Sequence, residues 1–289
     1  MNKYKAEYID NVLTLRFDRI GQGWEQWFML SGDRHHDNKY CNRELEEKQL
    51  RLAKEREALI LDFGDLFCAM QGKYDPRKSY DEIRPEDVGE NYLDRIVDHA
   101  AEFYTPYAIN FALIGRGNHD ANILKRFSHD IVSDLAKQLR KAGSNVVAGG
   151  YQGWVRFQFV MRKTVRQRIL IKYYHGKGGT SAPVTKGVID TNRQAASIVN
   201  ADIVVNGHNH QNYVLPVTRE YLTEGGKIKR NYMWFARTPG YEDGYFGRNG
   251  YDGFAAQQLG APHPIGCVWL RLTYYEKEIK IELIPDLGG

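Results

Sequence analysis

Residues 108–120 read AINFALIGRGNHD, an apolar run followed by glycines and a short polar cluster. The run Ala108–Ile114 predicts a buried β-strand, and the cluster Gly117–Asp120 comes where that strand must turn. Polar residues at a strand end sit on a rigid scaffold and can point into one crevice. This stretch therefore predicts a binding or catalytic site at the edge of a sheet. Apolar residues at helical spacing over 123–139 predict that one amphipathic helix follows.

The same arrangement, an apolar strand-like run ending in a polar cluster, occurs elsewhere along the chain. The other clusters are Gly32-Asp33-Arg34-His35, Gly64-Asp65, His175-Gly176 and Gly207-His208-Asn209-His210. Asp, Asn and His supply the oxygen and nitrogen atoms that Mn²⁺, Zn²⁺ and iron bind. The glycines allow sharp turns and leave room for a bound phosphate. Together the clusters predict a metal-binding crevice formed by several strand ends.

The composition is that of an ordinary globular enzyme. The chain has 289 residues, of which 42% are hydrophobic and 26% charged, and a formal net charge of +4. We expect a single domain over residues 1–289, and the charge alone does not indicate a nucleic-acid binder. There is no signal-peptide-like start and no apolar run of membrane length. No membrane partner is therefore expected. The cysteines, Cys41, Cys68 and Cys267, are few and far apart, which favours a reducing cytoplasm.

The order of the predicted elements indicates an α/β fold. Strands and helices alternate up to about residue 143, and strands dominate afterwards, as in the predicted hairpin of 155–161 with 168–174 and the C-terminal hairpin of 268–283. Strand–helix units beside hairpins favour a two-sheet β-sandwich flanked by helices. Residues 12–17 predict an added edge strand, and residues 232–235 a further short strand.

In order, the polar clusters resemble the motifs of the calcineurin-like metallophosphoesterase family. That pattern is D-x-H, G-D-x-x-D, G-N-H-D/E, an isolated His and G-H-x-H, and the resemblance runs from about Phe28 to His210. It implies a four-layer αββα fold and a hydrolase of phosphate esters. It also implies two divalent cations, with Mn²⁺ expected and Zn²⁺, iron or Ni²⁺ as alternatives, and a hydroxide activated between them as the nucleophile.

The resemblance also implies a role for each matching residue. His119 would be catalytic, either giving a proton to the leaving oxygen or steadying the transferring phosphoryl group. Asp65 would bridge the two cations, and Arg116 and Asn118 would contact the substrate. The implied ligands of the first cation are Asp33, His35, Asp65 and His210, and those of the second are Asp65, Asn118, His175 and His208.

The chain departs from the family pattern after the second motif. Cys68 stands where the serine/threonine phosphatase branch has an Asp that orients the histidine matching His119, and Ala69 stands where it has an Arg. A thiol is a weak hydrogen-bond partner, so we expect residue 68 not to replace that Asp. Less charge and bulk favour a phosphodiester, such as nucleic acid or a nucleotide. The alternatives are a phosphomonoesterase acting on phosphoprotein or a small metabolite, and a non-catalytic binding module of the same fold.

Other segments leave their roles open. Residues 64–67 look like the nuclease branch of the family. The basic residues at 162–168 form either a solvated turn or a nucleic-acid contact, and the Gly- and aromatic-rich stretch 241–254 is a lid, a stacking surface or a plain surface loop. His36 and Asp37 either support the ligands from behind or belong to a solvated loop, and Asp120 is expected to cap the following helix. The oligomeric state stays open.

Overall fold

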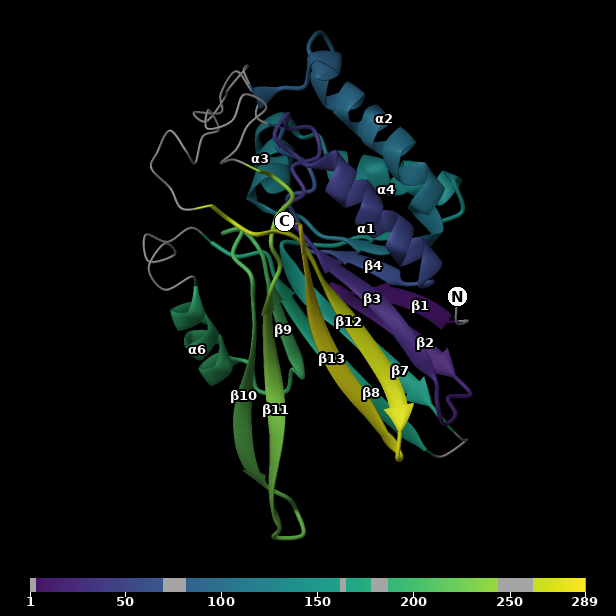
Figure 1. Cartoon of the computed structure of the whole chain (residues 1–289), viewed down its shortest axis with the longest axis vertical. Coiled ribbons are helices and arrows are strands. Elements are labelled where there is room, and N and C mark those ends of the chain that lie inside the picture. The colour runs from purple at the N-terminus through teal and green to yellow at the C-terminus, as the bar shows by residue number, and fades with distance from the viewer. Residues whose placement is uncertain (1–3, 70–81, 162–164, 178–186, 244–261, 289) are drawn as a thin grey trace.

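The apolar runs form two β-sheets packed face to face, as a computed structural model of the chain shows (Figure 1). The structure describes residues 4–69, 82–161, 165–177, 187–243 and 262–288. Large side chains from both sheets fill the space between them, including Phe28 and Leu61 of one sheet and Phe157 and Ile171 of the other. The expected α/β sandwich is therefore confirmed.

The first sheet has six strands and carries the parallel strands of the N-terminal half. β3, β4, β5 and β6 run parallel, so their carboxyl ends meet at one edge of the sheet, while β12 and β13 form an antiparallel hairpin on its other side. In spatial order the strands are β13 (Glu278–Gly288), β12 (Ile265–Tyr275), β3 (Glu25–Ser31), β4 (Leu59–Asp62), β5 (Phe111–Ile114) and β6 (Val147–Ala148).

The second sheet has seven strands. β8 pairs parallel with β9, and β9 parallel with β11, so these three strands also end at one edge. In spatial order the strands are β1 (Tyr4–Ile9), β2 (Val12–Asp18), β7 (Gln152–Val160), β8 (Arg166–Tyr174), β9 (Ile203–Asn206), β11 (Ile228–Arg237) and β10 (Tyr213–Leu222). As predicted, β7 and β8 form a hairpin.

Helices cover the outer faces, which gives the four layers implied by the family resemblance. Apolar residues such as Leu50, Ile96 and Leu135 pack α1, α2 and α4 against the six-stranded sheet, and Ala195 of α6 packs against the seven-stranded sheet (Figure 1). None of the described helices is long and apolar enough to cross a membrane. The helices are α1 (Arg43–Glu55), α2 (Tyr92–Tyr104), α3 (Asn118–Phe127), α4 (Ile131–Lys141) and α6 (Val188–Ser197), with short 3₁₀ turns η2 (Pro85–Asp87) and η3 (Thr105–Asn110).

Some predicted elements differ from those observed. The single helix predicted over 123–139 is two helices, because Ser128 takes a left-handed conformation with φ 54° and Asp130 then caps α4 by accepting from the Ser133 N–H. Residues 12–17, predicted as an edge strand, form β2 inside the seven-stranded sheet, because β1 lies at its edge. The strand predicted at 232–235 extends over Ile228–Arg237, and its partner β10 was not predicted.

Candidate metal centre

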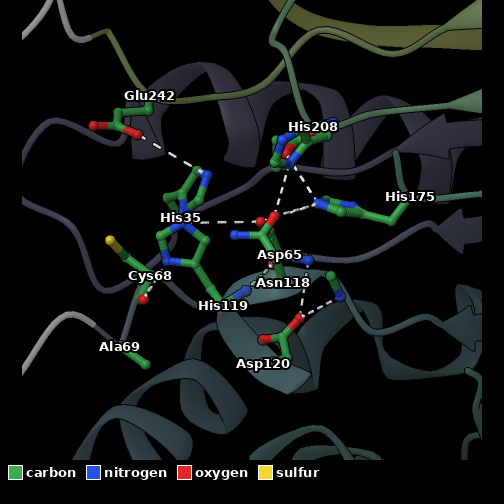
Figure 2. Close-up of polar contacts among 12 residues, drawn as sticks. His35, Asp65, Cys68, Ala69, Asn118, His119, Asp120, His175, His208 and Glu242 are labelled. Atoms are coloured by element: carbon green, nitrogen blue, oxygen red, sulfur yellow. Dashed lines mark hydrogen bonds and ion pairs between the residues drawn. The ribbon is translucent and has the colours of Figure 1, made fainter. Parts of the chain in front are cut away.

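Five strand ends bring the motif residues into one cluster (Figure 2). Three of these strands belong to the six-stranded sheet and two to the seven-stranded sheet, so the cluster lies where both sheets end. Asp33 and His35 follow β3, Asp65 follows β4, Asn118 and His119 follow β5, His175 follows β8, and His208 and His210 follow β9.

The first group of candidate ligands consists of Asp33, His35 and His210. Their ligand atoms all lie within 4.8 Å of one another. The Nε2 atoms of His35 and His210 are 3.3 Å apart, and Nε2 of His210 is 3.6 Å from Oδ1 of Asp33. Atoms bound to one cation at about 2.1 Å lie at most about 4.2 Å apart, so these two separations suit a shared ion.

The second group consists of Asp65, His175 and His208, again with ligand atoms within 4.8 Å of one another. Nε2 of His175 lies 3.0 Å from Oδ2 of Asp65. The side-chain oxygen of Asn118 joins this group, at 3.2 Å from Nε2 of His175 and 2.7 Å from Nδ1 of His208. The second ring nitrogen of His175 faces the backbone oxygen of Phe63 at 3.2 Å, which leaves Nε2 turned toward the group.

The two groups are contiguous, and their electrostatics suit cations. Nε2 of His175 is 3.8 Å from Oδ1 of Asp33 as well as close to Asp65. Oδ1 of Asp33 is buried and accepts no hydrogen bond from the described residues. Burial by itself lowers the pKa of His175, but Asp65 and Asp33 raise it to about 10. The carboxylates thus hold a proton on an imidazole where a divalent cation would replace it.

Several of these residues have an uncommon backbone conformation. Asp33, His35, Asp65, His208 and His210 all have positive φ values, between 45° and 75°. Residues other than glycine rarely adopt this region, and each such conformation costs roughly 1–3 kcal/mol. The surrounding fold therefore holds these side chains in place against a local conformational preference.

Motif glycines make room for the carboxylates. A Cβ on Gly117 would lie 2.0 Å from Oδ1 of Asp65, and a Cβ on Gly207 would lie 2.5 Å from Oδ2 of Asp33. Any larger residue at either position would displace the carboxylate beside it. The room that we expected these glycines to leave for a phosphate is, at these two positions, filled by the carboxylates of this chain.

The start of α3 fixes Asp65. The His119 backbone N–H donates to Oδ1 of Asp65 at 2.8 Å, at a helix N-terminus where the helix dipole stabilises negative charge. Asp120 accepts from the N–H of Gly117 at 3.0 Å and from that of Asp65 at 2.9 Å. Asp120 is therefore not the N-cap that we expected: α3 begins at Asn118 with Gly117 as its N-cap, and Asp120 binds that N-cap from the third position of the helix. It also ties α3 to the turn after β4.

His119 lies beside the ligand groups and has an orienting partner. Its Nδ1 lies 2.7 Å from the backbone oxygen of Cys68 and donates to it, while its Nε2 is 4.0 Å from Oδ2 of Asp65 (Figure 2). The expectation that residue 68 offers no replacement for the orienting Asp is therefore wrong. The replacement is the main-chain carbonyl of Cys68, which no side-chain comparison reveals.

Arg116, expected at the substrate, is engaged elsewhere. Its guanidinium forms an ion pair with Asp130 at 2.5 Å, donates to the Ser133 hydroxyl at 2.9 Å and contacts the backbone oxygen of Gly149. These bonds tie the turn after β5 to the start of α4. A direct contact with substrate would require this arginine to leave them.

Glu242 is a residue of the site that the sequence did not suggest. It follows β11, and its Oε2 lies 4.0 Å from Nε2 of His35 (Figure 2). Its Oε1 accepts from the Asn38 side-chain amide at 3.3 Å. Burial raises its pKa, Glu82 adds to that rise and His210 opposes it. No motif spacing marks Glu242, which stands at the start of the Gly- and aromatic-rich stretch 241–254. Residues 244–254 lie outside the part of the chain that the structure describes.

A buried charge network supports the turn that carries Asp33 and His35. The Arg34 guanidinium bonds to Asp62 at 2.6 Å and to Glu46 of α1 at 2.8 Å, with all three side chains fully buried. Glu46 also bonds to His36 at 2.9 Å and accepts from the Tyr104 hydroxyl. His36 therefore supports the ligand turn from behind, and the solvated alternative for it is excluded.

Replacing Glu46 by Gln is expected to lower the free energy of unfolding by about 3 kcal/mol at neutral pH, because it breaks a buried ion pair. Burial by itself raises the pKa of Glu46, but His36, Arg34 and Tyr104 outweigh it and the pKa falls to about 2. This contribution is present above the ordinary value of 4.5 and is lost as the pH falls toward 2. Urea unfolding of the wild type and Glu46→Gln should give free energies of unfolding that converge as the pH falls toward about 2. A constant gap would contradict the linkage.

Known proteins resemble the chain only at low sequence identity. No family model and no curated protein matches the chain. Solved structures that align with it include a metallophosphoesterase from Sphaerobacter thermophilus, at 9% identity and TM-score 0.35, covering 90% of this chain and 89% of that one. Vacuolar Protein Sorting 29 from Cryptosporidium parvum aligns at 14% identity and TM-score 0.36, covering 90% and 97%. A predicted phosphoesterase from Streptococcus pneumoniae aligns at 11% and 0.31, covering 90% and 89%. With TM-scores below 0.5, these likenesses do not bear on what the chain does.

Proposed function

We propose that the chain is a metal-dependent phosphodiesterase that hydrolyses nucleic acid or nucleotides. It would use two divalent cations, and Mn²⁺ is the expected metal. The observation that carries the proposal is the pair of contiguous ligand groups, Asp33-His35-His210 and Asp65-His175-His208, with Asn118 completing the second. Oxygen and nitrogen donors without a thiolate suit Mn²⁺, Zn²⁺ or iron. All the expected ligand positions are filled in both groups, which argues against a non-catalytic binding module.

In the reaction, water adds to phosphorus and the ester P–O bond breaks, giving a phosphomonoester and an alcohol. Bound cations would neutralise charge on the phosphoryl oxygens and acidify the attacking water. Asp65, fixed by the start of α3, would help to hold both cations. His119 would give a proton to the leaving oxygen through Nε2, since its Nδ1 is held by the Cys68 carbonyl.

Charge around the cluster favours a diester over a monoester. A monoester is largely a dianion at neutral pH, whereas a diester is a monoanion. The arginines adjoining the motifs have protein partners: Arg34 pairs with Asp62, Arg116 with Asp130, and Arg237 donates to the Gly207 carbonyl. Glu242 adds an acidic group beside His35. These features would penalise the second negative charge of a monoester.

We therefore expect kcat/KM to be higher for bis-p-nitrophenyl phosphate than for p-nitrophenyl phosphate, under the same metal and pH. The measurement is a comparison of both substrates, and of DNA, after reconstitution with Mn²⁺. Glu242→Gln should move the ratio toward the monoester, whereas Glu86→Gln, on the surface near α2, should leave it unchanged. A tenfold preference for the monoester, about 1.4 kcal/mol of transition-state stabilisation, would overturn the diesterase assignment in favour of a phosphomonoesterase.

A further inference from the structure

The segment that carries the Cys68 carbonyl is held by one buried carboxylate. Oδ1 of Asp37 accepts from the Cys68 N–H at 2.6 Å, and Oδ2 accepts from the Ala69 N–H at 2.7 Å. The hydroxyl of Tyr92, at the start of α2, donates to Oδ2 at 2.9 Å. Asp37 is 2% exposed, so water does not compete for these bonds. The solvated-loop alternative for Asp37 is thus excluded.

These hydrogen bonds fix the Cys68 carbonyl next to a residue with an uncommon backbone conformation. Ala69, immediately after Cys68, has a φ of 49°, which an alanine rarely adopts without outside support. The two N–H groups bound by Asp37 are those of Cys68 and Ala69, on either side of the Cα that bears the thiol. Because Asp37 holds both N–H groups, it sets the orientation of the peptide bond between Cys68 and Ala69. The carbonyl oxygen of that peptide accepts from Nδ1 of His119.

We propose that Asp37 is the positioning residue for His119, acting through the Cys68 main chain in place of a direct carboxylate–imidazole bond. The inference rests on the proposed function in taking His119 as the proton donor. In the doubly protonated ring, Nδ1 keeps its proton at the Cys68 carbonyl, so the proton on Nε2 passes to the leaving oxygen and leaves the neutral ring protonated on Nδ1. Asp37 touches neither substrate nor ring, so its effect is on tautomer and orientation.

The kinetic test uses Asp37→Asn, which keeps the size of the side chain but puts an N–H donor where a backbone N–H needs an acceptor. Hydrolysis of a dinucleotide diester, with its poor alkoxide leaving group, should slow by about 10–100-fold in kcat, the usual scale for losing an orienting partner. Hydrolysis of bis-p-nitrophenyl phosphate should slow by less than about threefold, since p-nitrophenolate leaves without a proton. Bound metal should stay at the wild-type level.

A double-mutant cycle separates positioning from general damage. In a His119→Asn background, Asp37→Asn should cost less than about threefold further, because the group that it positions is gone. The matched control is Asp87→Asn, which removes another buried carboxylate next to α2, bonded to His99 at 2.5 Å rather than to residues 68 and 69. Asp87→Asn should leave the ratio of kcat on the dinucleotide diester to kcat on bis-p-nitrophenyl phosphate unchanged. Equal slowing of both substrates by Asp37→Asn, or full additivity with His119→Asn, would overturn the proposal.

A readout without turnover keeps this inference distinct from the proposed function. In the full chain loaded with diamagnetic Zn²⁺, long-range ¹H–¹⁵N spectra of labelled histidine report which ring nitrogen of His119 carries a proton. His119→Asn assigns the signal. The wild type should show Nδ1 protonated and Asp37→Asn a mixture of tautomers, even if no phosphate ester is hydrolysed. An unchanged protonation pattern of His119 in Asp37→Asn would refute the positioning role of Asp37. An inactive wild type that shows the expected pattern would refute only the proposed phosphodiesterase function.

Discussion

Replacement of His119 by Asn is expected to lower kcat on a dinucleotide diester by about 10²–10⁴-fold while both cations stay bound. The imidazole lies beside the ligand groups, with Nε2 4.0 Å from Asp65 and Nδ1 on the Cys68 carbonyl, so it can move a proton without being needed as a ligand. Asn fits the space but offers no comparable proton. The loss on bis-p-nitrophenyl phosphate should be much smaller, because its leaving group needs no proton.

The experiment measures turnover on both substrates together with metal content by elemental analysis. His99→Asn is the matched control, because His99 lies on α2 and pairs with Asp87 away from the cluster; it should turn over like the wild type. His208→Ala should instead lose metal. Wild-type turnover of the dinucleotide by His119→Asn would show that another group donates the proton.

Replacement of Asp65 by Asn is expected to weaken both cations together, by about 100-fold each, and to abolish detectable turnover at limiting Mn²⁺. Asp65 belongs to the second ligand group, with Oδ2 3.0 Å from Nε2 of His175 and Oδ1 held by the His119 N–H, and that same His175 nitrogen is 3.8 Å from Asp33 of the first group. The amide keeps the shape but removes the negative charge that both cations would share. The wild type should bind about two ions per chain.

Calorimetric titration and thermal unfolding with and without Mn²⁺ measure this effect. At 100 times the dissociation constant, a bound ion stabilises the folded state by about 2.7 kcal/mol, so the melting temperature of the wild type should rise with Mn²⁺ and that of Asp65→Asn should not. His35→Ala, which alters only the first group, should weaken one ion and spare the other. Full activity with a single tightly bound ion would contradict the two-cation proposal.

The sequence predicted which residues lie together in the cluster better than it predicted the elements between them. Each polar cluster directly follows a buried strand, so local pattern and topology agree, and the structure gathers Asp33, Asp65, Asn118 and His175 as expected. The break between α3 and α4 was missed because the apolar spacing continues through it, and only the left-handed Ser128 and the cap at Asp130 reveal it. β10 was missed because Pro216 interrupts its apolar run and counts against a strand, whereas the structure accommodates the proline by placing β10 at the edge of its sheet.

Two features of the site lay beyond sequence reasoning for a physical reason. The acceptor for His119 is a main-chain carbonyl, and every residue has one, so its use depends on backbone conformation alone. Glu242 reaches the cluster through the path of the chain after β11, where no spacing rule applies. Asp37 was noted, but its bonds to residues 68 and 69 join separate loops and are set by tertiary structure.

The division of the cluster between two sheets bears on how the protein matures. His35 and His210, whose ring nitrogens are 3.3 Å apart, are separated by 175 positions in the chain. During synthesis the early strands emerge long before β9, so a nascent chain has only part of the cluster, and closing so large a loop is slow. Capture of a cation by the complete cluster must therefore await β8 and β9. Metal uptake should then follow the last folding phase, and a stopped-flow refolding trace with a metal-sensitive dye would record it as the slowest step.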